Sequence, residues 1–227
     1  MRKLKQTLNI IGLLLIATCT TFAGTDVTDS KDIKAIEVVK QDVQSDYSLE
    51  VGSGMNWGNV RSTGQANYDI VPTNLAFVQK IDDIGLTGWR RGYTEFVYQG
   101  YYDVITKDVS SESHITGGQF GPRYIFVPLD DSKWNFFVGS LVGFGFTDSN
   151  PIKVNNVPYG VGQDFLFNFI VNVGAKYKID NHWYVIGGPD YSHWSNAGLS
   201  ESSNPSFFHP NNPLDQVGFS LKLGYNF

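Results

Sequence analysis

Apolar and polar side chains alternate along most of the chain after residue 46, with the period of two that is typical of β-strands. Over 165–179, the odd-numbered positions from Phe165 to Ile179 are all apolar, whereas the even-numbered positions are mostly Asn, Gly and Lys. The last stretch alternates in the same way from Val217 to Phe227. The pattern therefore predicts an all-β fold built from long amphipathic strands.

Alternating stretches of this kind recur along the rest of the chain, and we predict eight strands, at 47–57, 68–81, 86–102, 114–127, 134–147, 164–179, 182–195 and 215–227. Short turns at 82–85, 128–133 and 180–181 alternate with longer loops at 58–67, 103–113, 148–163 and 196–214. These strands exceed the usual ~5–6 residues and match the ~9–11 needed to cross a bilayer at a tilt. The sequence therefore predicts an eight-stranded antiparallel transmembrane β-barrel over 47–227.

The distribution of aromatic residues agrees with a barrel in a membrane. We expect interfacial girdles at the strand ends, formed by Trp57, Trp134, Trp183, Tyr184 and Tyr225. The terminal Phe227 resembles the C-terminal signature of bacterial outer-membrane barrels. The apolar faces would meet lipid, and the narrow interior would hold small and polar side chains. The alternative is a secreted soluble β-sandwich or lipocalin-like barrel, whose apolar faces would fill a core.

Two groups of charged residues are expected inside this barrel. Glu95 follows Arg90 and Arg91 closely, which predicts an interior ion pair within this stretch. Arg123 lies in another predicted strand, at an inward-facing position. We interpret these charges as structural rather than as a substrate site.

The first 23 residues have the composition of a secretory signal peptide, with basic residues at positions 2, 3 and 5, an apolar run over 8–16 and a small-residue cleavage site ending at Ala23. Residues 24–46 are polar and charged, and we predict a leader without a fixed fold. The single cysteine, Cys19, lies in the signal peptide, so the mature chain would have no thiol chemistry. The alternative is a lipoprotein attachment site, because 16–19 resembles a lipobox.

Charge excludes some classes of partner. The formal net charge is −5, and loss of the three basic residues in 1–23 takes it to about −8. A chain of this charge with no basic patch is not expected to bind nucleic acid. The four histidines show no metal-ligand spacing, so we predict neither a metal nor a cofactor.

The stretch "HWSNAG" at 193–198 carries the candidate chemistry. His193 and Ser195 are two apart in a predicted strand, so both side chains lie on one face. Extending the last strand back by one step puts Asp215 on the same outer face, across the 196–214 loop. A Ser, a His and an acid are the parts of an activated nucleophile, and Asn196 could donate to an oxyanion. Polar groups on the lipid face are costly, which favours a functional interpretation.

Three segments near the C-terminus resemble the lipid A 3-O-deacylases, the PagL-type acyloxyacyl hydrolase family. They are "SHWSNAGL", "NNPLD" and "QVGFSLKLGYNF", and the likeness extends more weakly to the eight-strand layout. The resemblance implies an enzyme of the bacterial outer membrane that hydrolyses the ester-linked acyl chain at the 3-position of lipid A. It also implies that Ser195 is the nucleophile, His193 the base, Asn196 the oxyanion donor and Asp215 the acid.

Two features depart from the family's pattern. The acid position holds Asp rather than Glu, and the segment before it is lengthened by "SESSNPSFFHP" at 200–210, which makes Glu201 an alternative acid. We expect the acyl chain to lie along the barrel wall beside Tyr191, Val217 and Phe219. Lipid A of lipopolysaccharide is then the expected partner, with monomer and homodimer both open.

Two interpretations without catalysis stay open at this point. A small barrel could have a structural role, or could bind a partner through its long loops. A barrel that carries small apolar ligands would need an open interior, which eight strands hardly provide.

Overall fold

The computed structural model of the chain describes residues 46–60, 67–106, 114–129, 131–147, 152–154, 157–159, 165–195, 197 and 213–227. The predicted signal peptide, and the predicted leader up to residue 45, lie outside these residues. Within the described residues, no helix is long and apolar enough to cross a membrane.

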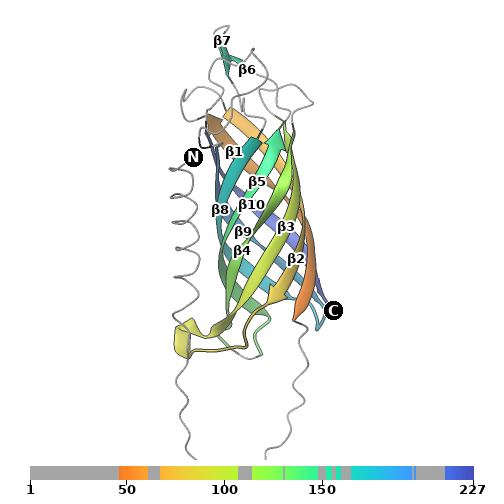
Figure 1. Cartoon of the computed structure of the whole chain (residues 1–227). Helices are drawn as coiled ribbons and strands as arrows, with labels where there is room; N and C mark the ends of the chain where they lie inside the picture. The colour runs from red at the N-terminus through yellow and green to blue at the C-terminus, as the bar shows by residue number, and fades with distance from the viewer. Residues whose placement is uncertain are drawn as a thin grey trace, which may run out of the picture. The chain divides into compact units, whose positions relative to one another are not determined.

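Eight long strands close into one antiparallel barrel, which confirms the predicted fold class (Figure 1). The barrel strands are β1 (Tyr47–Val60), β2 (Asn67–Lys80), β3 (Gly92–Ile105), β4 (His114–Phe126), β5 (Trp134–Thr147), β8 (Phe165–Lys178), β9 (Trp183–Ser195) and β10 (Leu214–Asn226). Each strand pairs with its neighbours in the chain, and β1 pairs with β10 to close the barrel. Closure leaves no unpaired edge in the barrel wall, which is what a strand structure needs in lipid.

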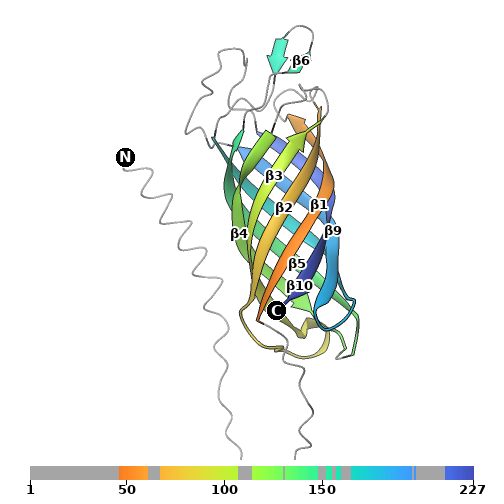
Figure 2. The ribbon, with the colours of Figure 1, turned by 90° about the vertical axis from the view of Figure 1, so that its right-hand side faces the viewer.

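The two ends of the barrel differ in their connections. One end carries the C-terminus and the short 3₁₀ helix η1 (Gly88–Arg90), and the other carries a small hairpin of β6 (Ile152–Val154) and β7 (Val157–Tyr159) (Figures 1 and 2). That hairpin lies in the predicted 148–163 loop. At the C-terminal end, the main-chain N–H groups of Trp183 and His182 donate to Asp180 and hold the pKa of its carboxyl below the usual value. This contact fixes the predicted tight turn between β8 and β9.

The connection between β2 and β3 differs from its prediction. A strand was expected from residue 86, but β3 begins at Gly92, where a bridge to Gly85 closes a wider turn. Leu86 and Gly88 have φ of 59° and 63°, a left-handed conformation that no strand can include. The predicted strand start is therefore wrong, because two residues turn the backbone away from the extended form.

This wider turn also overturns the predicted interior pair of Glu95 with Arg90 or Arg91. Arg90 belongs to η1 and is exposed, and Arg91 precedes the strand. Glu95 is buried in the barrel and pairs instead with Arg123 and Lys176.

The outer wall is apolar along its length. Outward positions carry large exposed apolar side chains, among them Leu75, Tyr98, Phe144, Phe169, Val217 and Phe219. Trp183 and Tyr225 pack together near one rim, with ring centroids 4.8 Å apart, as expected for a girdle. Tyr184 was placed in this girdle wrongly, because it is 1% exposed and its hydroxyl donates to Glu50 inside the barrel at 2.9 Å.

The interior near the C-terminal end holds a cluster of charged side chains. Arg123 donates to Glu50 at 2.6 Å and to Glu95 at 2.5 Å, and Lys176 donates to Glu95 at 2.8 Å. All four are buried, so the expectation that Arg123 faces inward is confirmed. These buried charges are of both signs, and each has a hydrogen-bonded partner of opposite charge, which offsets the cost of burying it.

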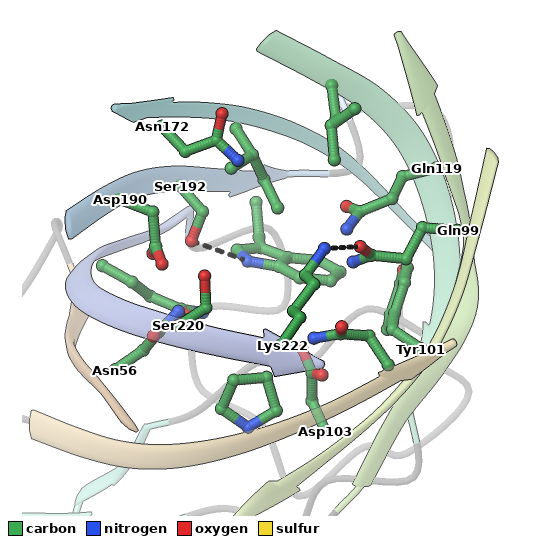
Figure 3. A pocket seen from close by; sticks show the side chains of 16 residues that line it. Asn56, Gln99, Tyr101, Asp103, Gln119, Asn172, Asp190, Ser192, Ser220 and Lys222 are labelled. Carbon is green, nitrogen blue, oxygen red and sulfur yellow. Dashed lines mark hydrogen bonds between the residues drawn. The ribbon is translucent and has the colours of Figure 1, made fainter. Parts of the chain in front are cut away.

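A polar cavity of about 40 Å³ occupies the interior beyond this cluster (Figure 3). Asp103, Asp190 and Asn172 line it, and Lys222 crosses it to donate to Gln99. A ligand of drug size needs roughly 300–1,000 Å³. This cavity therefore has no room for an acyl chain.

Candidate functional site

The site lies on the outer wall at the end of the barrel that carries the β6–β7 hairpin, where β9 ends and β10 begins. In the register of these strands, His193 lies directly opposite Asp215. The residues beside His193 on β9, Ser192 and Trp194, are buried in the interior. Because side chains alternate along a strand, His193 and Ser195 point to the outside.

His193 and Asp215 are joined by a short hydrogen bond. The Nδ1 of His193 lies 2.7 Å from the Oδ1 of Asp215, and their side chains are 30% and 23% exposed. A carboxylate accepts only, so Nδ1 carries the proton in this contact. In a neutral ring, Nε2 is then unprotonated and able to accept a proton.

Tyr191 joins the same carboxylate. Its hydroxyl donates to Asp215 Oδ1 at 2.8 Å, although its direct neighbour on β10 is Val217. Residues offset by two positions across a strand pair are within reach of long aromatic side chains. The sequence predicted Tyr191 only as an acyl-chain contact and missed this bond. The available signal was that it shares a face with His193 and is diagonal to Asp215.

Ser195 is the last residue of β9 and lies opposite Phe167 of β8. It follows His193 by two positions on the outer face. Beyond it, Ala197 has a φ of 53°, a left-handed conformation that lies outside the extended form of a strand. The predicted oxyanion donor Asn196 and the alternative acid Glu201 lie outside the described residues.

The surroundings of these polar groups are apolar. Val217 and Phe219 follow Asp215 along the outer face of β10 and are exposed. The Phe219 ring packs beside Trp57 of β1, with centroids 6.1 Å apart, and Phe169 of β8 lies opposite His193. The two predicted wall residues of β10 therefore form a continuous apolar surface next to Asp215.

This arrangement has the parts of a hydrolytic site. An imidazole held by a carboxylate on Nδ1 can take a proton on Nε2, and a hydroxyl shares its face. Within the described residues, no group of three His, Cys, Asp or Glu side chains is placed to hold a metal ion.

Comparisons with known proteins identify the fold. No protein-family model matches the chain, and no curated protein matches it. Among solved structures, Neisserial surface protein A (NspA) is similar with a TM-score of 0.56 and 10% identity, over 81% of this chain and 98% of that one. The outer membrane enzyme PagL is similar with a TM-score of 0.50 and 16% identity, over 77% of this chain and 97% of that one. Ail, the attachment invasion locus protein of Yersinia pestis, has a TM-score of 0.44 and 9% identity.

The likenesses to NspA and PagL agree with the barrel described above. The fold is that of a small outer-membrane β-barrel. Identities of 10% and 16% show the fold alone. One of these two neighbours is named as an enzyme and the other as a surface protein, so the fold does not by itself distinguish a catalytic barrel from a non-catalytic one.

Proposed function

We propose that the chain is an outer-membrane serine esterase that removes an ester-linked acyl chain from lipid A, at the 3-position that the sequence resemblance implies. The observation that carries the proposal is the 2.7 Å hydrogen bond between His193 Nδ1 and Asp215 Oδ1 on the outer wall, two residues from Ser195. An acid and an imidazole that are hydrogen-bonded to each other lie near a serine on a surface that would face lipid. Such a group of residues could hydrolyse a substrate that is itself a lipid.

In the proposed reaction, His193 Nε2 takes the proton of the Ser195 hydroxyl while Oγ attacks the ester carbonyl. Asp215 stabilises the imidazolium that forms. The tetrahedral intermediate collapses when His193 returns the proton to the leaving sugar oxygen, which gives an acyl-serine and lipid A with one free hydroxyl. Water, deprotonated by His193, then attacks the acyl-serine carbonyl. The bond to Ser195 Oγ breaks as His193 returns the proton to Oγ, and a 3-hydroxy fatty acid leaves. Asn196 is the proposed donor to the oxyanion.

The position of the site on the outer wall supports this assignment, because an acyl chain could reach it from the membrane and no binding pocket would be needed. Lipid A lies in the same membrane that would surround the barrel, so its acyl chains would run along the wall. Val217 and Phe219 form an apolar surface next to Asp215, in the direction that a chain anchored at the site would follow. The interior cavity of about 40 Å³ could not hold such a chain.

The first test is the mass of lipid A from cells that express the protein. Wild type should yield lipid A lacking one 3-hydroxyacyl group. Ser195→Ala and His193→Ala should lower the trimming by at least about a thousandfold, because the nucleophile and its base act as a unit. Ser53→Ala changes an outward serine of β1 and is the matched control, which should trim as wild type does. Untrimmed lipid A with folded wild type, or trimming by Ser195→Ala at the wild-type rate, would contradict the proposal.

A further inference from the structure

We propose that Tyr191 is a positioning residue, whose hydroxyl fixes the carboxylate of Asp215 for His193. This inference rests on the proposed esterase function and deepens it. The geometry is the evidence: Tyr191 Oη and His193 Nδ1 both contact one oxygen, Asp215 Oδ1, at 2.8 Å and 2.7 Å.

The two contacts have different origins in the barrel. His193 faces Asp215 directly across β9 and β10, so its reach is set by the strand register. Tyr191 is offset by two residues and faces Val217, and its long ring brings the hydroxyl back along the strand to the carboxylate. Val171 of β8 lies on its other side. A tyrosine has only two side-chain torsions, so little conformational freedom is lost when its hydroxyl binds the carboxylate.

A short acid on a lipid-facing wall benefits from such a donor. A carboxylate can turn about its own axis, and either of its oxygens could face the imidazole. A hydroxyl bound to Oδ1 restricts that rotation and keeps the same oxygen toward Nδ1. A hydroxyl that donates to a charged carboxylate also makes a stronger hydrogen bond than one between two neutral groups. The aspartate at this position therefore works together with Tyr191.

This role differs from contact with the acyl chain. Tyr191→Phe keeps the ring on the wall and removes the hydroxyl, so a residue that only contacts the acyl chain would tolerate it. A positioning residue would not tolerate it, because the lost bond is to a charged group. We expect kcat to fall about 10- to 100-fold, the equivalent of one hydrogen bond to a charge, with KM little changed.

A double-mutant cycle on the full-length protein in lipid A-containing detergent micelles tests the coupling. Tyr191→Phe should lower kcat in the wild-type background and have no further effect in an Asp215→Asn background, because the tyrosine acts through the acid. Tyr98→Phe is the matched control. It changes an outward tyrosine of β3, on the opposite side of the barrel, and should leave kcat unchanged. Equal effects of Tyr191→Phe in both backgrounds, or no effect in either, would overturn the proposal.

A second measurement tests the positioning role of Tyr191 independently of esterase activity. The rate at which the His193 Nδ1 proton exchanges with water can be followed by NMR in nanodiscs, with His193→Ala to assign the signal. Tyr191→Phe should speed this exchange at least tenfold, and an unchanged rate would overturn the positioning role. If wild type leaves lipid A intact, the esterase function fails, and the exchange rate still decides whether Tyr191 holds Asp215.

Discussion

Asp215 is the residue on which the candidate site depends, since its Oδ1 accepts from His193 and from Tyr191. The strand period alone could place His193, Ser195 and Asp215 on one face, because an alternating pattern fixes which side chains share a side. The hydroxyl contact of Tyr191 could not be predicted in this way. It depends on the direction of a ring that reaches two positions along the neighbouring strand.

The residue-scale prediction concerns the charge of Asp215. Asp215→Asn should keep the shape of the site and lower the rate of lipid A deacylation by about 10³- to 10⁴-fold, because an amide neither holds the same tautomer of the imidazole nor stabilises the imidazolium. The rate is measured with purified protein and lipid A by mass spectrometry. Asp131→Asn, in the exposed turn between β4 and β5, is the control and should be silent. A rate within tenfold of wild type would show that another acid serves His193.

At the scale of strands, close packing across the barrel wall depends on small residues. Gly218 of β10 faces inward, and a Cβ at this position would collide with the side-chain oxygen of Asn56 and with the main-chain oxygen of Met55. Gly100 of β3 faces outward and has open space at the same position. The inward face of β10 therefore has room only for glycine at this position, because Asn56 of the neighbouring strand β1 fills the space.

This difference gives a paired prediction. Gly218→Ala should destabilise the barrel by about 1–3 kcal/mol, because overpacking forces its neighbours to move. Gly100→Ala should leave stability unchanged or raise it slightly, since it removes freedom from the unfolded chain without a clash. Urea unfolding of the two variants in detergent, followed by tryptophan fluorescence, measures both. Equal midpoints for the two variants would contradict the packing argument.

Most strands could be predicted because their alternation is long and regular, as in β5, β8 and β10. The start of β3 could not, because Leu86 adopts a left-handed conformation that is rare for its residue type. The predicted ends of β1 and β3, at residues 57 and 102, were also too early, because the ladders of these strands continue to Val60 and Ile105. Main-chain pairing extends a strand further than hydrophobic alternation reveals.

At the scale of the whole barrel, the buried charges are the feature that sequence order hides. Arg123 of β4 contacts Glu50 of β1 and Glu95 of β3, and Lys176 of β8 completes the group. The side chains from these four strands reach the same height in the barrel only because the strands pair in a particular register. The inward phase of Arg123 could be predicted, but its two partners could not.

Arg123→Met tests this central cluster. It leaves two buried carboxylates without their guanidinium, and it should destabilise the barrel by about 3–5 kcal/mol, the usual effect of breaking a buried ion pair. The urea midpoint in detergent at equal protein and micelle concentration is the measurement. Asp83→Ala removes the exposed partner of Lys80 and should change the midpoint little. A small effect of Arg123→Met would mean that the carboxylates are satisfied without it.

The central claim is that Ser195 on the outer wall, with His193 and Asp215, hydrolyses an acyl ester of lipid A. The most direct measurement incubates the purified barrel with lipid A vesicles in ¹⁸O-labelled water and analyses both products by mass spectrometry. The account predicts a 3-hydroxy fatty acid with ¹⁸O in its carboxylate, unlabelled deacylated lipid A, and no product from Ser195→Ala. Intact lipid A with wild-type protein, or label in the sugar hydroxyl, would contradict it.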